Sequence, residues 1–123
     1  MSAIFFPTST EFRKWLKKNH ARETEIYVGY YKIITGKPTM TWSESVDQAL
    51  CFGWIDSVKN TIDSESYCIR FTPRKKNSNW SAINIKKVET LTKAGLMMPA
   101  GQKAFESRKA DKKVVVLTKV KGT

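Results

Sequence analysis

Residues 41–84 restrict the fold more than any other part of the chain, because signals for a helix and two strands follow one another there in fixed order. A capping box, Thr-Trp-Ser-Glu, predicts a helix over residues 41–53. Residues 54–62 and 66–72 read as two strands, and the polar residues 63–65 between them predict a turn. A helix followed by a β-hairpin is therefore expected at the centre of the fold.

A polar and basic loop over residues 73–79 follows the hairpin and leads into a predicted helix over residues 80–94. Ser78 or Asn79 is the expected N-cap of this helix, and Gly95 is its expected C-terminal cap. Loop donors beside a helix N-terminus are typical of an anion-binding site. The sequence therefore predicts that an anion binds near the start of this helix.

The rest of the chain adds predicted elements on both sides of this centre. A capping box predicts a helix over residues 8–20, and the β-branched and aromatic residues 25–33 predict a strand buried on both faces. A turn is expected at 35–38, and a last helix over 99–108. This order predicts an α+β fold, in which a short mixed or antiparallel sheet with a β-hairpin packs against about four helices.

The 123 residues fit one domain, predicted over residues 1–110, followed by a basic tail over residues 111–123 with a strand-like apolar run. No apolar run approaches the roughly 20 residues that a membrane-spanning helix needs. The first residues also lack the basic and long apolar segments of a signal peptide. We therefore expect a cytoplasmic protein without membrane insertion.

Few side chains are suited to catalysis or metal binding. His20 is the only histidine, and its position at a helix end favours a capping role. No nucleophile motif accompanies it. Cys51 and Cys68 are not spaced as a CxxC pair, and together with one histidine they do not form a zinc site. The sequence therefore predicts no catalytic residue, no metal and no cofactor.

The second strand of the hairpin carries one arginine among apolar residues. Alternation places Tyr67, Ile69 and Phe71 on one face of this strand and Arg70 on the other. A buried arginine needs a partner, because an unpaired buried charge is strongly unfavourable. Asp56, near the start of the preceding strand, is the candidate partner. The alternative, that Arg70 lies on the solvent face, is equally compatible with the sequence.

The net charge of +11, from 22 basic and 11 acidic residues, favours contact with anions. Arginines supply charge and paired donors, hydroxyl and amide groups orient a ligand, and indole rings form walls. Asp56 is expected to hold an arginine in place. Asn84 interrupts an apolar helix face, so it either fixes the preceding loop or reaches a ligand. The candidate ligand-binding residues are Trp54, Asp56, Arg70, Arg74, Ser78, Trp80, Ser81 and Asn84.

Four motifs occur in register: ALCFGWIDS (49–57), RFTPRK (70–75), SNWSAIN (78–84) and GLMMPAG (95–101). With these motifs the chain resembles the YdeI/OmpD-associated family, also called bacteriocin-protection proteins. The resemblance implies a small α+β domain, protection against bacteriocins or other antimicrobial peptides, and a link to an outer-membrane porin. The chain departs from the family after the KAD segment, where relatives continue with an aromatic residue and further helical sequence.

We expect a non-enzymatic binding module for an anionic small molecule or an acidic group of a protein partner. Nucleic-acid binding through the basic loop and tail is an alternative, which no recognised DNA or RNA motif favours. An enzyme of unknown reaction that uses Asp56 or Cys51 is a further alternative. The sequence leaves the oligomeric state open.

Overall fold

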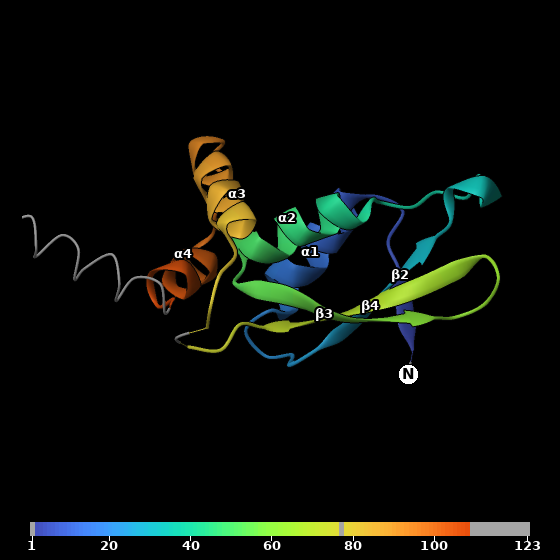
Figure 1. Cartoon of the computed structure of the whole chain (residues 1–123), viewed down its shortest axis with the longest axis horizontal. Helices are drawn as coiled ribbons and strands as arrows, with labels where there is room; N and C mark the ends of the chain where they lie inside the picture. The colour runs from blue at the N-terminus through green and yellow to red at the C-terminus, as the bar shows by residue number, and fades with distance from the viewer. Residues whose placement is uncertain (1, 77, 109–123) are drawn as a thin grey trace, which may run out of the picture.

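Helices cover one face of a four-stranded mixed sheet in the computed structural model, which describes residues 2–76 and 78–108 (Figure 1). The strands are β1 (Ala3–Phe5), β2 (Ile26–Tyr31), β3 (Trp54–Thr61) and β4 (Ser66–Pro73). The helices are α1 (Ser9–Asn19), the short 3-10 helix η1 (Ile33–Thr35), α2 (Trp42–Cys51), α3 (Ala82–Lys93) and α4 (Pro99–Glu106). The predicted α+β class is confirmed. The tail 111–123, with its strand-like run, and the predicted domain boundary lie outside the described residues.

The sheet has the strand order β1-β2-β4-β3, in which β1 pairs parallel with β2 and the other pairs are antiparallel. The predicted hairpin is present as β3 and β4. Strand β1 was not predicted, because three residues are too short to show a period-two pattern. A register shift between Asp56 and Lys59 bends β3 at the edge of the sheet.

The core lies between the sheet and the helices above it. Ile26 pairs with Phe71 and Val28 pairs with Ile69 across β2 and β4, so these four side chains share the face toward α1 and α2. Phe12 of α1 packs edge-on against Phe71, with 5.4 Å between the ring centroids. The alternation predicted for β4 is therefore confirmed.

One helix boundary and one strand boundary differ clearly from the predictions. The helix expected from residue 80 begins at Ala82, with Ser81 as N-cap in place of Ser78 or Asn79. The strand expected to reach residue 33 ends at Tyr31, and the chain then turns through η1. Both segments combine short polar or branched residues, whose caps and turns depend on local hydrogen bonds more than on apolar periodicity.

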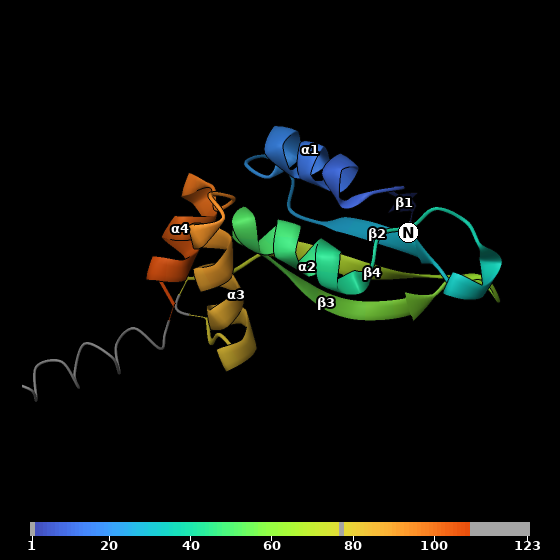
Figure 2. The same ribbon diagram turned by 90° about the horizontal axis from the view of Figure 1, so that it is seen from above.

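None of the helices among the described residues is long and apolar enough to cross a membrane. Figures 1 and 2 show α3 and α4 at one end of the molecule and η1 at the opposite end. The two ends of the sheet are therefore covered by different parts of the chain.

Helix α4 is joined to the end of α2 by an unusually close backbone contact. The amide of Met98 donates to the carbonyl oxygen of Cys51 at 3.0 Å. Gly101 follows on the first turn of α4, where a Cβ atom would collide with the Cys51 carbonyl and lie 2.7 Å from the Leu50 carbonyl oxygen. Gly53 faces the same turn: a Cβ there would lie 2.9 Å from the carbonyl oxygen of Ala100.

Adding one methyl group at Gly101 should therefore push α4 away from α2. We expect Gly101→Ala to lower the free energy of unfolding by about 3 kcal/mol, as overpacking in a rigid site does. Urea unfolding measures this change. Gly36→Ala is the control, because Gly36 has φ 71° but no atom within 4 Å of the added methyl group; it should cost only about 1 kcal/mol. Equal losses in the two variants would contradict the steric explanation.

Candidate functional site

The close contact of α2 and α4 forms one wall of a surface cavity of about 350 Å³. The cavity lies where α1, the start of β3, the end of β4 and helix α4 meet. Its lining residues are His20, Ala21, Phe52, Gly53, Trp54, Pro73, Arg74, Lys75, Lys76, Ala100, Lys103, Ala104 and Ser107. The size falls within the usual range for small-molecule sites.

The charges around this cavity are of one sign. Arg74, Lys75 and Lys76 follow β4, and Lys103 projects from α4 on the other side. No carboxylate stands among the described residues that line it. A second hollow beside β1, of about 480 Å³, contrasts with it, because Glu23 and Glu25 line that one. The first cavity is therefore suited to an anion.

The interior of the cavity is apolar. Phe52 and Trp54 are buried, and Trp54 packs edge-on against Trp15 with 5.8 Å between the ring centroids. Ala100 and Ala104 complete this surface from α4. The cavity thus combines an apolar interior with cationic side chains.

Arg74 is the cation with the most unusual environment. Its guanidinium carbon lies 3.8 Å from the centroid of the Trp80 ring, a cation–π contact. The side chain is half-buried, and its Nε has no hydrogen-bond partner among residues 2–76 and 78–108. Burial lowers the pKa of Arg74 to about 10, and the negative charge of Asp56 partly opposes this effect.

Trp80 holds Arg74 without lining the cavity itself. Its ring is packed at 77° against Phe105 of α4, with 5.4 Å between centroids, so α4 fixes the indole and the indole fixes the guanidinium. The indole Nε1 of Trp80 and the hydroxyl of Ser78 are also buried, and neither has a hydrogen-bond partner within the described part of the chain. Arg74 and Trp80 are therefore in direct contact, and the ligand-binding role predicted for Arg74, Ser78 and Trp80 stays a prediction.

Arg70 and Asp56 lie elsewhere, and the predicted pair between them is wrong. The Nε of Arg70 donates to Glu25 at 2.7 Å on the sheet face away from the helices. Asp56 pairs with Phe71 in the sheet and faces α2, where its carboxylate accepts from the Trp42 indole at 3.0 Å. Side chains of adjacent positions point to opposite faces of a strand, so Asp56 beside Phe71 cannot reach Arg70.

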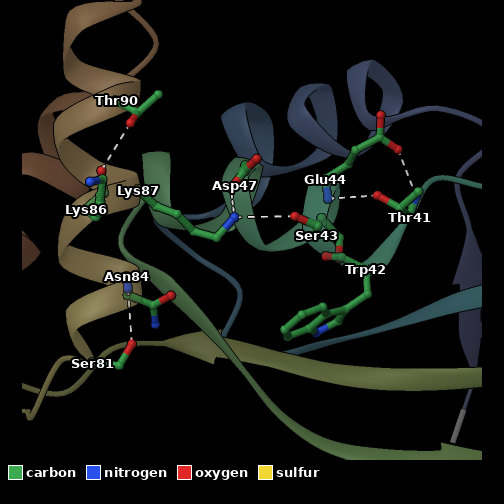
Figure 3. Close-up of polar contacts among 11 residues, drawn as sticks. Thr41, Trp42, Ser43, Glu44, Asp47, Ser81, Asn84, Lys86, Lys87 and Thr90 are labelled. Carbon is green, nitrogen blue, oxygen red and sulfur yellow. Dashed lines mark hydrogen bonds and ion pairs between the residues drawn. The ribbon is translucent and has the colours of Figure 1, made fainter.

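Ser81 and Asn84 lie in the first turn of α3. The backbone N–H of Asn84 donates to the hydroxyl of Ser81 at 3.1 Å, which is an N-cap (Figure 3). Further along α3, Lys87 forms an ion pair with Asp47 of α2 at 2.7 Å, as Figure 3 also shows. No residue of α3 lines the cavity. Ser81 and Asn84, which were predicted to bind an anion at the start of this helix, therefore do not line the cavity.

Residues from the end of α1 and from α4 line the cavity, and neither contribution was predicted from the sequence. His20 caps α1, as predicted, and its Nδ1 lies 2.8 Å from the Leu16 carbonyl oxygen, so Nδ1 is the donor. Its ring also lines the cavity. Lys103 of α4 is exposed and lines the cavity from the other side. The GLMMPAG motif was the available signal, because it contains Gly101, at which the structure brings α4 close to the Cys51 carbonyl.

The described residues offer little support for a reactive cysteine or a metal site. Cys51 is fully buried, and burial raises the pKa of its thiol, which disfavours the reactive thiolate. Within residues 2–76 and 78–108 there is no group of three or more His, Cys, Asp or Glu side chains that could hold a metal ion.

A family model described as "Domain of unknown function (DUF8412)" matches residues 4–104. The chain belongs to this family. The match runs from β1 into α4, so the family domain includes every residue that lines the cavity except Ser107. Searches of curated proteins and of solved structures gave no match. The resemblance to YdeI/OmpD-associated proteins stays a prediction.

The charge of Arg74 should cost stability in the absence of a ligand. Because its pKa is lowered to about 10, the charged form opposes folding at neutral pH, and this effect fades as the pH rises through 10. Solvent contact reduces the cost, and the stacking on Trp80 offsets roughly 1 kcal/mol of it. We therefore expect Arg74→Met to be as stable as the wild type, or up to about 1 kcal/mol more stable, at pH 7.

Urea unfolding at pH 7 and at pH 10.5 checks this expectation, with Arg74→Lys as the variant that keeps a positive charge. A clear loss of stability in Arg74→Met at pH 7 would show that the guanidinium stabilises the fold and is not held there against a desolvation cost.

Proposed function

We propose that this protein is a non-enzymatic binding module for an anionic small molecule with an apolar body. The observation that carries the proposal is the charge of the cavity: Arg74, Lys75, Lys76 and Lys103 line it without a carboxylate among the described lining residues. Cations held at one place without a protein counter-ion are attracted to an anionic ligand.

The apolar interior favours a particular kind of anion. Ala100 and Ala104 of α4 offer apolar surface that inorganic phosphate cannot use, and Phe52 and Trp54 lie almost fully buried behind it. A planar or aliphatic group fits against them, while the anionic group reaches the cations. Burial of that apolar surface contributes roughly 25 cal/mol per Å². The proposed ligand therefore carries an anionic group and an apolar group.

Arg74 has the role of principal anion-binding residue. Its guanidinium is oriented by the Trp80 ring, so a ligand meets donors that are already in place. A carboxylate or phosphate in the cavity would pair with the positive charge of Arg74, which forms no ion pair with a carboxylate of the described residues. Such a ligand also reverses the effect that lowers the pKa of Arg74. Ligand binding and stability are therefore coupled.

This coupling gives a direct test with 1-naphthyl phosphate as probe, and with 1-naphthol and inorganic phosphate as its separate halves. We expect the whole probe to raise the unfolding temperature more than either half. Arg74→Met should weaken probe binding, measured by calorimetry, at least about tenfold, because a charge-assisted hydrogen bond is worth about 1.5–3 kcal/mol.

Arg70→Met is the matched control, because Arg70 is paired with Glu25 away from the cavity. Its affinity for the probe should equal that of the wild type. The proposal is overturned if both arginine variants lose affinity equally, or if no naphthyl anion binds while duplex DNA binds with a steep salt dependence. The second outcome would favour the nucleic-acid alternative.

We also propose the biological role that the resemblance to bacteriocin-protection proteins implies, namely resistance to antimicrobial peptides or related stress. The four motifs quoted for the resemblance support this role, and three of them contribute residues to the cavity. In a host that lacks the protein, the wild-type chain should restore survival under a bacteriocin, and Arg74→Met should not. Equal survival with the wild-type chain and with Arg74→Met would show that protection does not depend on Arg74 in the cavity.

A further inference from the structure

A pair of isoleucines is held in full contact with solvent at the end of the molecule opposite the cavity. Ile33 and Ile34 are 93% and 92% exposed, the highest values among the large apolar side chains described. They lie on η1, the teal helical turn at the far end of the molecule from α3 and α4 in Figures 1 and 2. We call residues 32–37 the isoleucine finger.

The finger is an ordered turn. The amide of Lys32 donates to the Glu65 carbonyl oxygen at 2.9 Å, which ties the base of the finger to the hairpin. The Thr35 hydroxyl donates to the Lys32 carbonyl oxygen at 2.8 Å and accepts from the Lys37 amide at 3.1 Å. Gly36 ends the turn with φ 71°, in the left-handed region. The backbone therefore fixes the two side chains outward.

These two exposed side chains bury almost no apolar surface in the core of the fold. An isolated exposed apolar side chain is ordinary on a protein surface. Two adjacent isoleucines, almost fully exposed on a turn that hydrogen bonds hold rigid, are more typical of a surface that contacts a partner. Ile62, 42% exposed, lies near the tip of the hairpin to which the base of the finger is tied. A third exposed isoleucine therefore lies on the hairpin that holds the finger.

Basic side chains flank the apolar tip. Lys32 is exposed beside Ile33, and Lys37 lies on the other side of the turn, over the Tyr31 ring at 4.8 Å. Two acids are close: Glu65 pairs with Lys37 at 3.2 Å, and Asp63 accepts from the Glu65 amide and the Ser66 hydroxyl. Lys59 of β3 lies over the ring of Tyr67 of β4, further along the hairpin. The surroundings are thus mildly cationic in a chain of net charge +11.

We propose that the isoleucine finger inserts into the interface of an anionic lipid bilayer and docks this protein peripherally. The two isoleucines enter the acyl boundary, and Lys32 and Lys37 meet the headgroups. A convex, narrow tip suits a deformable lipid surface, whereas a protein partner would need a matching hollow. The net positive charge of the chain favours approach to the anionic surface.

The test is co-sedimentation of the full chain with phosphatidylcholine vesicles that contain phosphatidylglycerol, compared with vesicles of phosphatidylcholine alone. The wild type should sediment with the anionic vesicles and much less with the neutral ones. The double variant Ile33→Ser/Ile34→Ser should reduce the partition coefficient at least about tenfold. Because neither side chain is packed, its circular dichroism and unfolding midpoint should equal those of the wild type.

Ile83→Ser is the matched control, because Ile83 is 71% exposed on α3, away from the finger. It should bind vesicles as the wild type does. The proposal is overturned if the wild type ignores anionic vesicles, if it binds neutral vesicles equally well, or if the double variant sediments like the wild type. It is also overturned if the double variant instead abolishes a concentration-dependent dimer in size-exclusion chromatography, which would assign the finger to contact between copies of this chain.

Discussion

The close approach of α4 to the end of α2 is the contact on which the candidate site depends. Gly101 is needed there because only a hydrogen atom fits between its Cα and the Cys51 carbonyl. The Met98 amide then satisfies that carbonyl, which the end of α2 would otherwise leave unpaired. Arg13 reinforces the junction by donating to Gln48 of α2 at 3.0 Å and to the Leu96 carbonyl at 2.7 Å. Lys103, Ala104 and Phe105 reach the cavity region only because this junction holds.

The same junction explains why a half-buried arginine persists. Phe105 of α4 packs on Trp80, and Trp80 stacks on Arg74, so the guanidinium is held in place by apolar contacts. A protein carboxylate at Nε would have removed the desolvation cost, and it would also have neutralised the cavity. Asp56 acts on Arg74 through its charge, while its carboxylate accepts a hydrogen bond from the Trp42 indole. The arrangement therefore keeps the positive charge available to a ligand.

The order of elements could be predicted from sequence wherever local signals were strong. Both N-terminal capping boxes and the hairpin alternation gave the correct elements, because caps and strand periodicity are local. Arg74 and Trp80, which are in contact, could be placed together because they lie within seven positions of sequence. The Arg70–Asp56 pair failed because the strand faces, which the register fixes, were not known. Lys103 and His20 were missed because the packing of α4 and α1 around the cavity is a long-range property.

The two proposed surfaces depend on different parts of the structure. The cavity requires the α2–α4 junction, the Trp80 stack and the loop after β4, so any change that loosens α4 should also disperse the cations. The isoleucine finger depends on hydrogen bonds within residues 32–37 and on one tie to the hairpin at Glu65. The sheet lies between the finger and the cavity, and no residue of the finger lines the cavity. The proposed docking surface and the proposed ligand site therefore share no described residue, so substitutions at one are not expected to alter the other.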